Sequence, residues 1–560
     1  MTLTEWIIFF FAVQIVHGIG TWKLYIKAGK KAWEAFVPVY NGVVFMDIIN
    51  RPRWWVFLLF LPIINLILFP VIWVETARSF GKNKTIDSVL AVVTLGFYSY
   101  YINYLQDAEY KKDRDINPVS SSGEWTSSIL FAIVAATLVH TYFMQPFVIP
   151  TSSLEKTLLK GDFLLVSKFH YGARPPMTAI AAPMVHDSLP IVKRLSYLKK
   201  PQIPYMRIPG FQNIKRNDIV VFNWPADTLY NMYKKADKRY DKPIDKKTNY
   251  VKRCVAIAGD SLEVRDGYVF IDGKKTVLPD RAKTQFYYTV ISKKYLSPQY
   301  LKEEIGTTEF NKHYRLDKAN AAKYDFQAKD LKPFPNDSTA YMVELNWQTR
   351  VNSEFKTTDR YSINMSEEEY AKLNKNPDIV SIKRNVKPKG QREENIFPLH
   401  GKFDWNGDNF GPIYIPEAGK TITLDIKSLP IYKKIITEYE GNNLSSTGND
   451  IFINGKLAET YTFKQNYYWM MGDNRQNSLD ARYWGYVPFD HVIGKPVFVW
   501  MSISGVELGL KNIKNWKFNW NRIFTTVGGS GKPVSYFPYF LALMAIWQGY
   551  VFYKKKKGDS

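Results

Sequence analysis

A long run without charge is the feature of this sequence that most limits its fold. From Thr126 to Ile149 the chain contains no Asp, Glu, Lys or Arg. A helix of about 20 such residues crosses the roughly 30 Å of hydrocarbon in a bilayer. A helix buried in a soluble core is a weak alternative for this run. The sequence therefore predicts a membrane-spanning helix at residues 125–149.

Four further apolar stretches approach the length that a span needs. One of them contains Pro62, Asn65 and Pro70 and is expected to be kinked. The first lacks both a basic leading segment and an Ala-x-Ala site, so it is not interpreted as a cleaved leader. For the third, a buried helix of a soluble core remains a fair alternative. The five expected spans are residues 6–21, 54–74, 88–105, 125–149 and 536–553.

Clusters of lysine and arginine set the orientation of these spans, because such clusters tend to stay on the cytoplasmic side. Placing the clusters after spans one, three and five in the cytoplasm gives one consistent path. The N-terminus and residues 150–533 then lie on the extracytoplasmic side, with Lys82 and Lys84 as a small exception. The clusters are Lys23, Lys27, Lys30 and Lys31; Lys111, Lys112 and Arg114; and residues 554–557.

Composition narrows the class of protein. The 560 residues carry a formal net charge of +23, which fits nucleic acid, anionic lipid or plain solubility. The sequence has no Arg-rich helix, zinc-ligand spacing or RNP-like motif, so nucleic acid is not expected as a partner. The one cysteine, Cys254, excludes a disulfide framework within the chain. The seven histidines form no HxxxH or HxH pair, so neither a metal nor another cofactor is expected.

The region after the charge-free run is expected to be mainly β. Short runs of β-branched and aromatic residues alternate with Gly, Asp and Asn. Residues 276–449 are polar and Lys-rich, and they are interpreted as an inserted α+β subdomain with an acid-capped helix at 366–376. The expected strand regions are residues 163–169, 217–225, 249–274, 450–456 and 495–504.

The expected fold is thus a multi-span α-helical membrane anchor joined to a mainly β extracytoplasmic domain with a long insertion. The expected divisions are residues 1–122 with about three spans, 123–149 as a transmembrane helix, 150–275 and 450–533 as the two parts of the β domain, 276–449 as the insertion, and 534–560 as a C-terminal transmembrane helix with a basic tail.

Two adjacent serines, Ser152 and Ser153, follow the charge-free span directly. A serine hydroxyl becomes a nucleophile when a base takes its proton. The histidines lie in no recognisable triad motif and metal ligands are lacking, which leaves a lysine as the base. A lysine must be neutral for this role, and burial lowers its pKa. Lys252 is the candidate, because strand alternation places it on one face with Cys254 and Ala256; an edge lysine is the ordinary alternative.

A polar loop at residues 470–488 sits between apolar runs and contains three aromatic residues, which predicts that it packs inward. Buried polar groups need partners inside the protein. We therefore expect Asp473, Asp480 and Arg482 to form ion pairs and Ser478 to hydrogen-bond a buried amine. A surface loop is the alternative.

Four blocks of the chain resemble the bacterial type I signal peptidases (leader peptidases), a family of membrane-anchored serine–lysine proteases. They cover a small part of the chain, but they occur in the family's order and follow a spanning helix, which makes the resemblance specific. The resemblance implies a signal-peptidase-like β fold for the domain outside the membrane. In order, the blocks are VIPTSSLEKTLLKGDFLLVSKF, RNDIVVFNWP, YVKRCVAIAGD and MMGDNRQNSLDARYWGYVP.

The resemblance also implies roles for particular residues. Ser153 corresponds to the family's nucleophile and Lys252 to its general base. The oxyanion is expected to bind the backbone N–H of Ser153 and the hydroxyl of Thr151, and Ser478 is expected to orient the lysine amine. The implied structural ion pairs near the site involve Asp473, Asp480 and Arg482, and the implied pockets for small substrate side chains involve Phe147, Ile149, Leu154, Leu158, Tyr250 and Val251.

The chain also departs from the family pattern. Leu154 stands where the family usually has Met, and Lys156 stands where it usually has Pro. Leu preserves the volume of Met, whereas the loss of Pro is expected to loosen the turn. Thr151 adds a methyl group to the implied oxyanion donor. The first three spans and the long insertion exceed the family's minimal plan.

The resemblance implies an enzyme of the bacterial inner membrane, in a Gram-negative envelope, with its catalytic domain on the periplasmic face. It would cut exported preproteins after small residues of an Ala-x-Ala site through an acyl-enzyme, without a cofactor. Its partners would be preproteins, membrane lipid and the secretion translocon. Two other classes stay open: an anchored binding module that has lost its site, and an envelope scaffold or transporter built on the spans. A cytosolic self-cleaving repressor with a Ser–Lys dyad is excluded by the spans.

Overall fold

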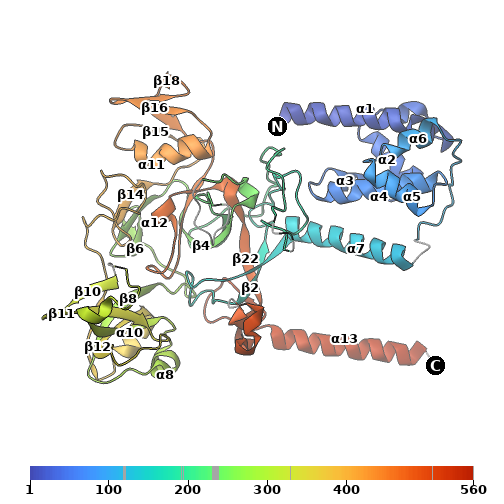
Figure 1. Cartoon of the computed structure of the whole chain (residues 1–560). Coiled ribbons are helices and arrows are strands. Elements are labelled where there is room, and N and C mark those ends of the chain that lie inside the picture. The colour runs from blue at the N-terminus through green and yellow to red at the C-terminus, as the bar shows by residue number, and fades with distance from the viewer. Residues whose placement is uncertain are drawn as a thin grey trace.

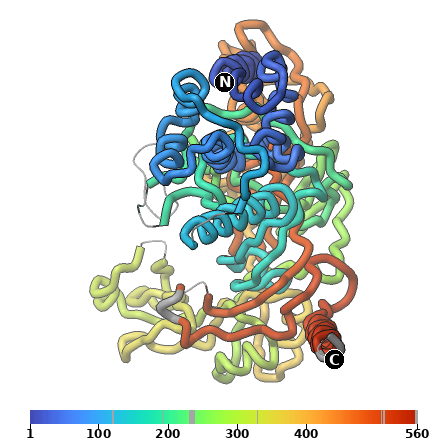
Figure 2. The backbone as a smooth tube through the Cα atoms, turned by 90° about the vertical axis from the view of Figure 1, so that its right-hand side faces the viewer, coloured from blue at the N-terminus to red at the C-terminus, as the bar shows by residue number. Residues whose placement is uncertain are grey.

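The computed structural model describes residues 1–117, 121–190, 192, 194–229, 239–327, 330–506 and 509–558. A helical region comes first, a mainly β body follows, and one helix closes the described chain (Figure 1). Three long helices extend from the same side of the β body: α1 (Leu3–Lys27), α7 (Ser121–Leu138) and α13 (Phe537–Gly558). Figure 2 looks along them and shows α1 and α13 at opposite ends of the molecule, with α7 between them.

Two helices among the described residues are long and apolar enough to cross a membrane, α1 and the segment Ser121–Phe143, in which α7 continues as the π-helical turn η2 (Val139–Phe143). The protein therefore has a membrane anchor, and the charge-free run forms the helix that the sequence predicts. α13 covers the fifth expected span as one helix of 22 residues, but it is less apolar than these two helices and is not counted with them.

The second and third expected spans are broken. The second forms two helices, α3 (Trp55–Leu59) and α4 (Ile64–Ser79), which are separated where Ile63 has a φ of 71°. The third forms α5 (Thr85–Val93) and α6 (Tyr98–Tyr104), which are bent by 115°. The break in the second segment lies beside Pro62, within the stretch that was expected to be kinked, whereas the bend in the third segment was not expected.

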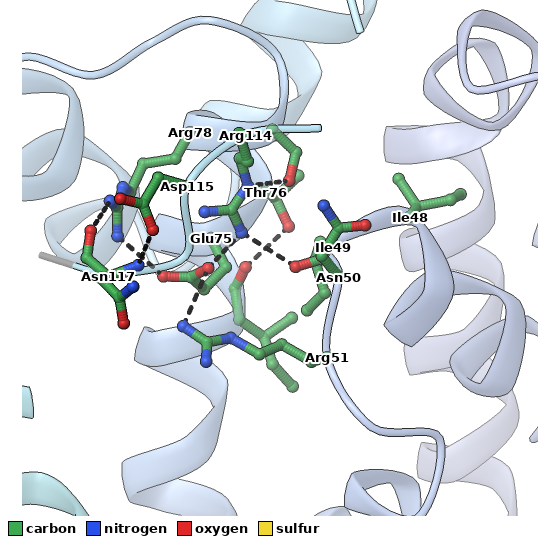
Figure 3. A network of polar contacts seen from close by, with 12 residues as sticks. Ile48, Ile49, Asn50, Arg51, Glu75, Thr76, Arg78, Arg114, Asp115 and Asn117 are labelled. Carbon is green, nitrogen blue, oxygen red and sulfur yellow. Dashed lines mark hydrogen bonds and ion pairs between the residues drawn. The ribbon is translucent and has the colours of Figure 1, made fainter. Parts of the chain in front are cut away.

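A buried carboxylate ties the N-terminal helices to the segment before α7 (Figure 3). Glu75 of α4 is 4 % exposed. It pairs with Arg51 at 3.3 Å, with Arg78 at 3.2 Å and with Arg114. Arg51 precedes α3 and Arg114 lies in the segment that leads to α7, so one carboxylate joins three parts of the chain. Two further short helices complete this region, η1 (Ala32–Ala35) and α2 (Tyr40–Ile48).

The β body is built on an antiparallel sheet with strand order β1-β2-β22-β3-β4-β20-β21, in which β23 and β24 also pair with β22. Its central strands are buried on both faces, so they are rich in β-branched and aromatic residues. The strands are β1 (Met144–Val148), β2 (Asp162–Ser167), β3 (Ile219–Asn223), β4 (Asn249–Ala256), β20 (Tyr467–Met471), β21 (Val487–Pro488), β22 (Val492–Ser504), β23 (Lys517–Phe518) and β24 (Thr525–Thr526).

Two apolar clusters cover the two faces of this sheet. Phe222 and Cys254 belong to the largest core, whereas Val221 and Val251 belong to a smaller core with Leu154. Strand alternation therefore assigns Lys252, between Val251 and Arg253, to the face of Cys254. Smaller sheets extend the largest core: β14 (Phe410–Tyr414), β5 (Ser261–Arg265), β6 (Tyr268–Ile271) and β7 (Lys274–Lys275); β15 (Thr421–Thr423) with β19 (Thr460–Thr462); and β16 (Leu444–Thr447), β17 (Asp450–Ile453) and β18 (Lys456–Leu457).

The inserted subdomain is shorter than the sequence suggested. Its six strands lie between residues 285 and 384, whereas β14 pairs with β5, and α11 (Leu429–Lys434) contributes to the largest core. The chain thus rejoins the β body by Phe410, well before residue 449. The expected helix at 366–376 forms as α10 (Glu367–Leu373), with Ser366 and Glu369 as a capping box. The inserted strands are β8 (Gln285–Ser292), β9 (Phe310–Asp317), β10 (Leu331–Phe334), β11 (Asp337–Asn346), β12 (Lys356–Ser366) and β13 (Ile379–Arg384).

Candidate active site

Ser153 and Lys252 meet in a buried contact. Ser153 lies in the turn between β1 and β2, and Lys252 lies in the middle of β4. The two side chains are 7 % and 3 % exposed, and the Nζ of Lys252 is 2.5 Å from the Oγ of Ser153. A nucleophile within hydrogen-bond distance of a base is the geometry that covalent catalysis requires.

The surroundings of Lys252 favour a neutral amine. The pKa of Lys252 is lowered to about 8, chiefly by burial; Arg482 contributes to the lowering, whereas Asp480 and Asp473 oppose it. The Tyr250 ring lies on the same face, with its centroid 5.6 Å from the Nζ. A lysine with a pKa near the working pH can act as a general base.

The adjacent Ser152 has a different environment. Its Oγ accepts a hydrogen bond from the Nδ2 of Asn477 at 3.0 Å, and its carbonyl oxygen accepts one from the Nδ2 of Asn474 at 3.2 Å. The backbone N–H of Asn474 donates to the carbonyl oxygen of Ser153 at 3.1 Å. The hydroxyl of Ser152 thus holds the turn, while that of Ser153 faces the Lys252 amine.

The loop that supplies these asparagines is held by two buried ion pairs. Asp480 accepts from the Nε and Nη2 of Arg482 at 2.8 and 2.9 Å, and Asp473 accepts from the Nε and Nη2 of Arg253 at 2.7 and 2.6 Å. Burial raises the pKa of both carboxyls, but the paired arginines outweigh it and leave each pKa below its usual value. Sequence reasoning missed Arg253, although its place beside Lys252 on a strand puts it on the opposite face.

Ser478 lies close to the nucleophile but does not bond the lysine. Its Oγ is buried and has no hydrogen-bond partner among the described residues. A Cβ at Gly472 would lie 2.3 Å from this Oγ and 2.5 Å from the carbonyl oxygen of Ser153. Gly472 therefore lets Ser478 and the nucleophile turn approach from two sides. Thr151 is exposed at the start of the same turn.

The turn after Ser153 is fixed by contacts rather than by a proline. Lys156 has a φ of 70°, a conformation that proline cannot adopt. Its Nζ donates to the carbonyl oxygen of Gly306 at 2.5 Å and pairs with Glu369 at 2.8 Å. Both partners belong to the insertion. The expectation of a looser turn stays a prediction, which these two contacts oppose.

The six residues expected to line substrate pockets fall into two groups. Ile149, Leu154 and Leu158 are at most 3 % exposed and belong to the smaller core, so they offer no surface to a substrate. Phe147 and Val251 lie at the edge of the same core and are half-buried, and half-buried Tyr250 lies beside the larger one. No group of three or more His, Cys, Asp or Glu that could hold a metal occurs within the described residues.

Both the N-terminal helical region and the β body resemble known proteins. Residues 33–113 match a family of unknown function, DUF5684. Among curated proteins, "Signal peptidase I" of Buchnera aphidicola subsp. Baizongia pistaciae is 24 % identical over 377 residues, 67 % of this chain and 75 % of the relative. "Signal peptidase I" of Helicobacter pylori is 24 % identical over 420 residues, 73 % of this chain and 94 % of the relative. That of Rickettsia massiliae is 27 % identical over 195 residues, 34 % and 56 % of the two chains.

A family model also matches the chain from the charge-free helix onward. Residues 122–339 and 415–501 match the family described as "Signal peptidase, peptidase S26". This match contains Ser153, Lys252 and the loop with Ser478, and it leaves out part of the insertion. Because it spans more than half of the chain, this protein belongs to the signal peptidase family, peptidase S26, and is a membrane-anchored serine peptidase.

Proposed function

We propose that this protein removes signal peptides from exported preproteins by cutting after small residues in Ala-x-Ala sites, with Ser153 as nucleophile and Lys252 as general base. The observation that carries the proposal is the 2.5 Å contact between the Ser153 Oγ and the Lys252 Nζ in a buried site. A buried amine with a pKa of about 8 supports the base role, because a substantial fraction is neutral at neutral to mildly alkaline pH.

The reaction follows from this geometry. Neutral Lys252 takes the proton of the Ser153 hydroxyl as the Oγ bonds to the substrate carbonyl carbon. The backbone N–H of Ser153 and the hydroxyl of Thr151 donate to the oxyanion, and one such donor contributes about 3–4 kcal/mol in other hydrolases. The Lys252 ammonium then protonates the leaving amine as the C–N bond breaks. Water, with Lys252 again as base, hydrolyses the ester and restores Ser153.

Specificity for small side chains is assigned to the half-buried members of the six residues expected to line substrate pockets. Phe147, Tyr250 and Val251 have surface that a substrate can contact. The buried Ile149, Leu154 and Leu158 support them from behind. Ser478 is assigned to orient the Lys252 amine, whose N–H would donate to the Ser478 Oγ while the lone pair of the amine stays directed at Ser153.

The membrane orientation is proposed from the arrangement of the long helices. α1, α7 and α13 leave one side of the β body (Figure 1), and basic clusters lie at the far ends of α1 and α13. Basic segments favour the cytoplasm. The β body would then lie on the extracytoplasmic face of a bacterial inner membrane, anchored by several passes. A preprotein held in lipid by its apolar segment, or delivered by the translocon, would present its cleavage site near this body.

Cleavage of a preprotein with an Ala-x-Ala site, in detergent, tests this function. We expect Ser153→Ala and Lys252→Ala to lose activity by several orders of magnitude. Ser152→Ala is the matched control and should keep far more activity than these two variants, because its hydroxyl holds the turn but takes no part in the reaction. Activity of Ser153→Ala equal to wild type would show that the nucleophile is another residue. If wild type cleaves no such substrate, the binding-module class is favoured instead.

A further inference from the structure

One carboxylate of the insertion reaches the loop beside the active site. Glu309 lies immediately before β9, an interior strand of the inserted sheet. Its carboxylate accepts hydrogen bonds from the Nδ2 of Asn364 on β12 at 3.0 Å, of Asn474 at 2.8 Å and of Asn477 at 3.1 Å. Three neutral amides thus converge on one charged acceptor, and hydrogen bonds to a charged group are the stronger kind.

Two of these amides are the ones that hold the nucleophile turn. Asn474 donates from its Nδ2 to the carbonyl oxygen of Ser152, and Asn477 donates from its Nδ2 to the Oγ of Ser152. An amide nitrogen has two hydrogens. One hydrogen of each asparagine can serve Glu309 while the other serves Ser152. The carboxylate therefore fixes which end of each amide faces the turn.

The neighbouring contacts show that the insertion holds this turn at several points. The pairs of Lys156 with Glu369 and with the Gly306 carbonyl lie three residues after Ser153. The backbone N–H of Arg475, next to Asn474, donates to the carbonyl oxygen of Gln285 at the start of β8. The inserted sheet and the loop of residues 470–488 thus both contact the turn around Ser153. Glu309 is the charged residue of the insertion that binds this loop.

We propose that Glu309 is a positioning residue for Ser153, which acts from the inserted sheet by orienting the amides of Asn474 and Asn477. This inference rests on the function proposed above. It gives the insertion a role in the reaction: the inserted sheet sets the geometry of the nucleophile turn and does not merely lie beside it.

Glu309→Gln tests the proposal. Glutamine keeps the size of the side chain but places an NH2 group at one of the two oxygen positions. The Nδ2 of Asn477 lies 3.2 Å from Oε1 and 3.1 Å from Oε2, so this donor meets the NH2 group in either orientation. We expect kcat on a preprotein to fall about 10- to 100-fold through misplacement of Ser153, with KM within about twofold and the melting temperature close to wild type. Glu304→Gln, an exposed acid of the same insertion, is the matched control and should match wild type.

A double variant separates positioning from a general structural effect. If Glu309 acts through Asn477, the double variant Glu309→Gln/Asn477→Ala should have a kcat only slightly below that of the slower single variant. The effects of two residues in one network are not additive. A fold-loss of kcat in the double variant equal to the product of the two single losses would overturn the proposal. So would an unchanged kcat in Glu309→Gln, or a loss confined to KM. If Glu309→Gln does not fold, Asn477→Ala alone must lower kcat, and a normal kcat there overturns the inference.

The same assay keeps the inference separate from the proposed function. An inactive Ser153→Ala beside a fully active Glu309→Gln would leave the function standing and remove only the positioning role. If wild type cleaves no preprotein, the rate of Ser153 labelling by a fluorophosphonate replaces kcat. Slower labelling of Glu309→Gln than of Glu304→Gln would then support positioning, and equal rates would contradict it.

Discussion

Lys252 is a buried amine without a carboxylate of its own. The nearest acids, Asp473 and Asp480, are each engaged at two oxygens by an arginine, and none of the described carboxylates pairs with the Nζ of Lys252. A buried cation is costly unless it is paired. Partnering the acids with arginine therefore favours the neutral lysine, which is the form that the proposed mechanism needs.

The pH dependence of cleavage should report this amine. Because Lys252 must be neutral to act as a base, kcat/KM should rise with pH and level off above an apparent pKa of about 8. A pH profile with one preprotein between pH 6 and 10 measures it. A rising limb near pH 10.5, the ordinary range of lysine, would show that burial does not tune this residue.

Removing the amine should stabilise the fold. Below pH 8 the native state must keep a charged Lys252 in a desolvated site, and a shift from 10.5 to about 8 corresponds to a cost on the order of 3 kcal/mol. Lys252→Met should therefore be inactive but more stable at pH 7. Between pH 8 and 10.5 the folded protein loses the proton before the unfolded chain does, so the gain should shrink across that window.

Denaturant unfolding of Lys252→Met and wild type at pH 7 and pH 10 measures this difference, and Val251→Met, at the neighbouring position on β4, controls for the new side chain. A gain that is equal at both pH values would mean that packing, not charge, explains it.

Among the site residues, sequence reasoning could name Ser153 and Lys252 because their neighbours form recognisable blocks. It could not find Arg253 as the partner of Asp473, since that pair joins residues 220 positions apart. Nor could it find Glu309, which lies in no motif and reaches the site only through the folded insertion.

At the scale of elements, the turn from Ser153 to Gly161 shows how an insertion replaces a local constraint. Where the family usually has proline, Lys156 adopts a left-handed backbone and binds Gly306 and Glu369. Strands were predictable because alternation and turn residues are local signals. The end of the insertion was not, because it depends on β14 pairing with β5, about 145 residues earlier.

Lys156→Pro should damage this turn although it restores the family's usual residue. Proline requires a φ near −65°, so the backbone must rearrange, at a cost of about 1–3 kcal/mol, and kcat should fall. Lys156→Gly is the control, because glycine accepts the left-handed backbone and loses only the side-chain contacts. Thermal unfolding and cleavage rates measure both effects. A Lys156→Pro enzyme as stable and active as wild type would contradict the left-handed turn.

At the scale of the whole molecule, the apolar stretches were visible in the sequence but their shapes were not. Ile63 and Leu95 take left-handed conformations that nothing in their residue types announces. The sequence thus predicts where apolar segments lie, whereas tertiary packing decides which of them run straight through a membrane.

The orientation of the molecule can be measured with single cysteines. Cys254, the only cysteine of the chain, is fully buried, so a maleimide should not label the wild-type protein. A membrane-impermeant maleimide should label Val277→Cys, at a residue of the β body that is 87 % exposed, in intact spheroplasts. Lys112→Cys, in the segment before α7, should be labelled only after the membrane is opened. The reverse pattern would contradict the proposed extracytoplasmic β body.

The most direct test of the account is to locate the acyl-enzyme. Wild type, Ser152→Ala and Lys252→Ala are mixed with an acyl donor that mimics an Ala-x-Ala site, and the modified residue is identified by peptide mass spectrometry. The account predicts acylation of Ser153 in wild type and in Ser152→Ala, and little in Lys252→Ala at pH 8. An acyl group on Ser152, or equal acylation of Ser153 without Lys252, would contradict the dyad.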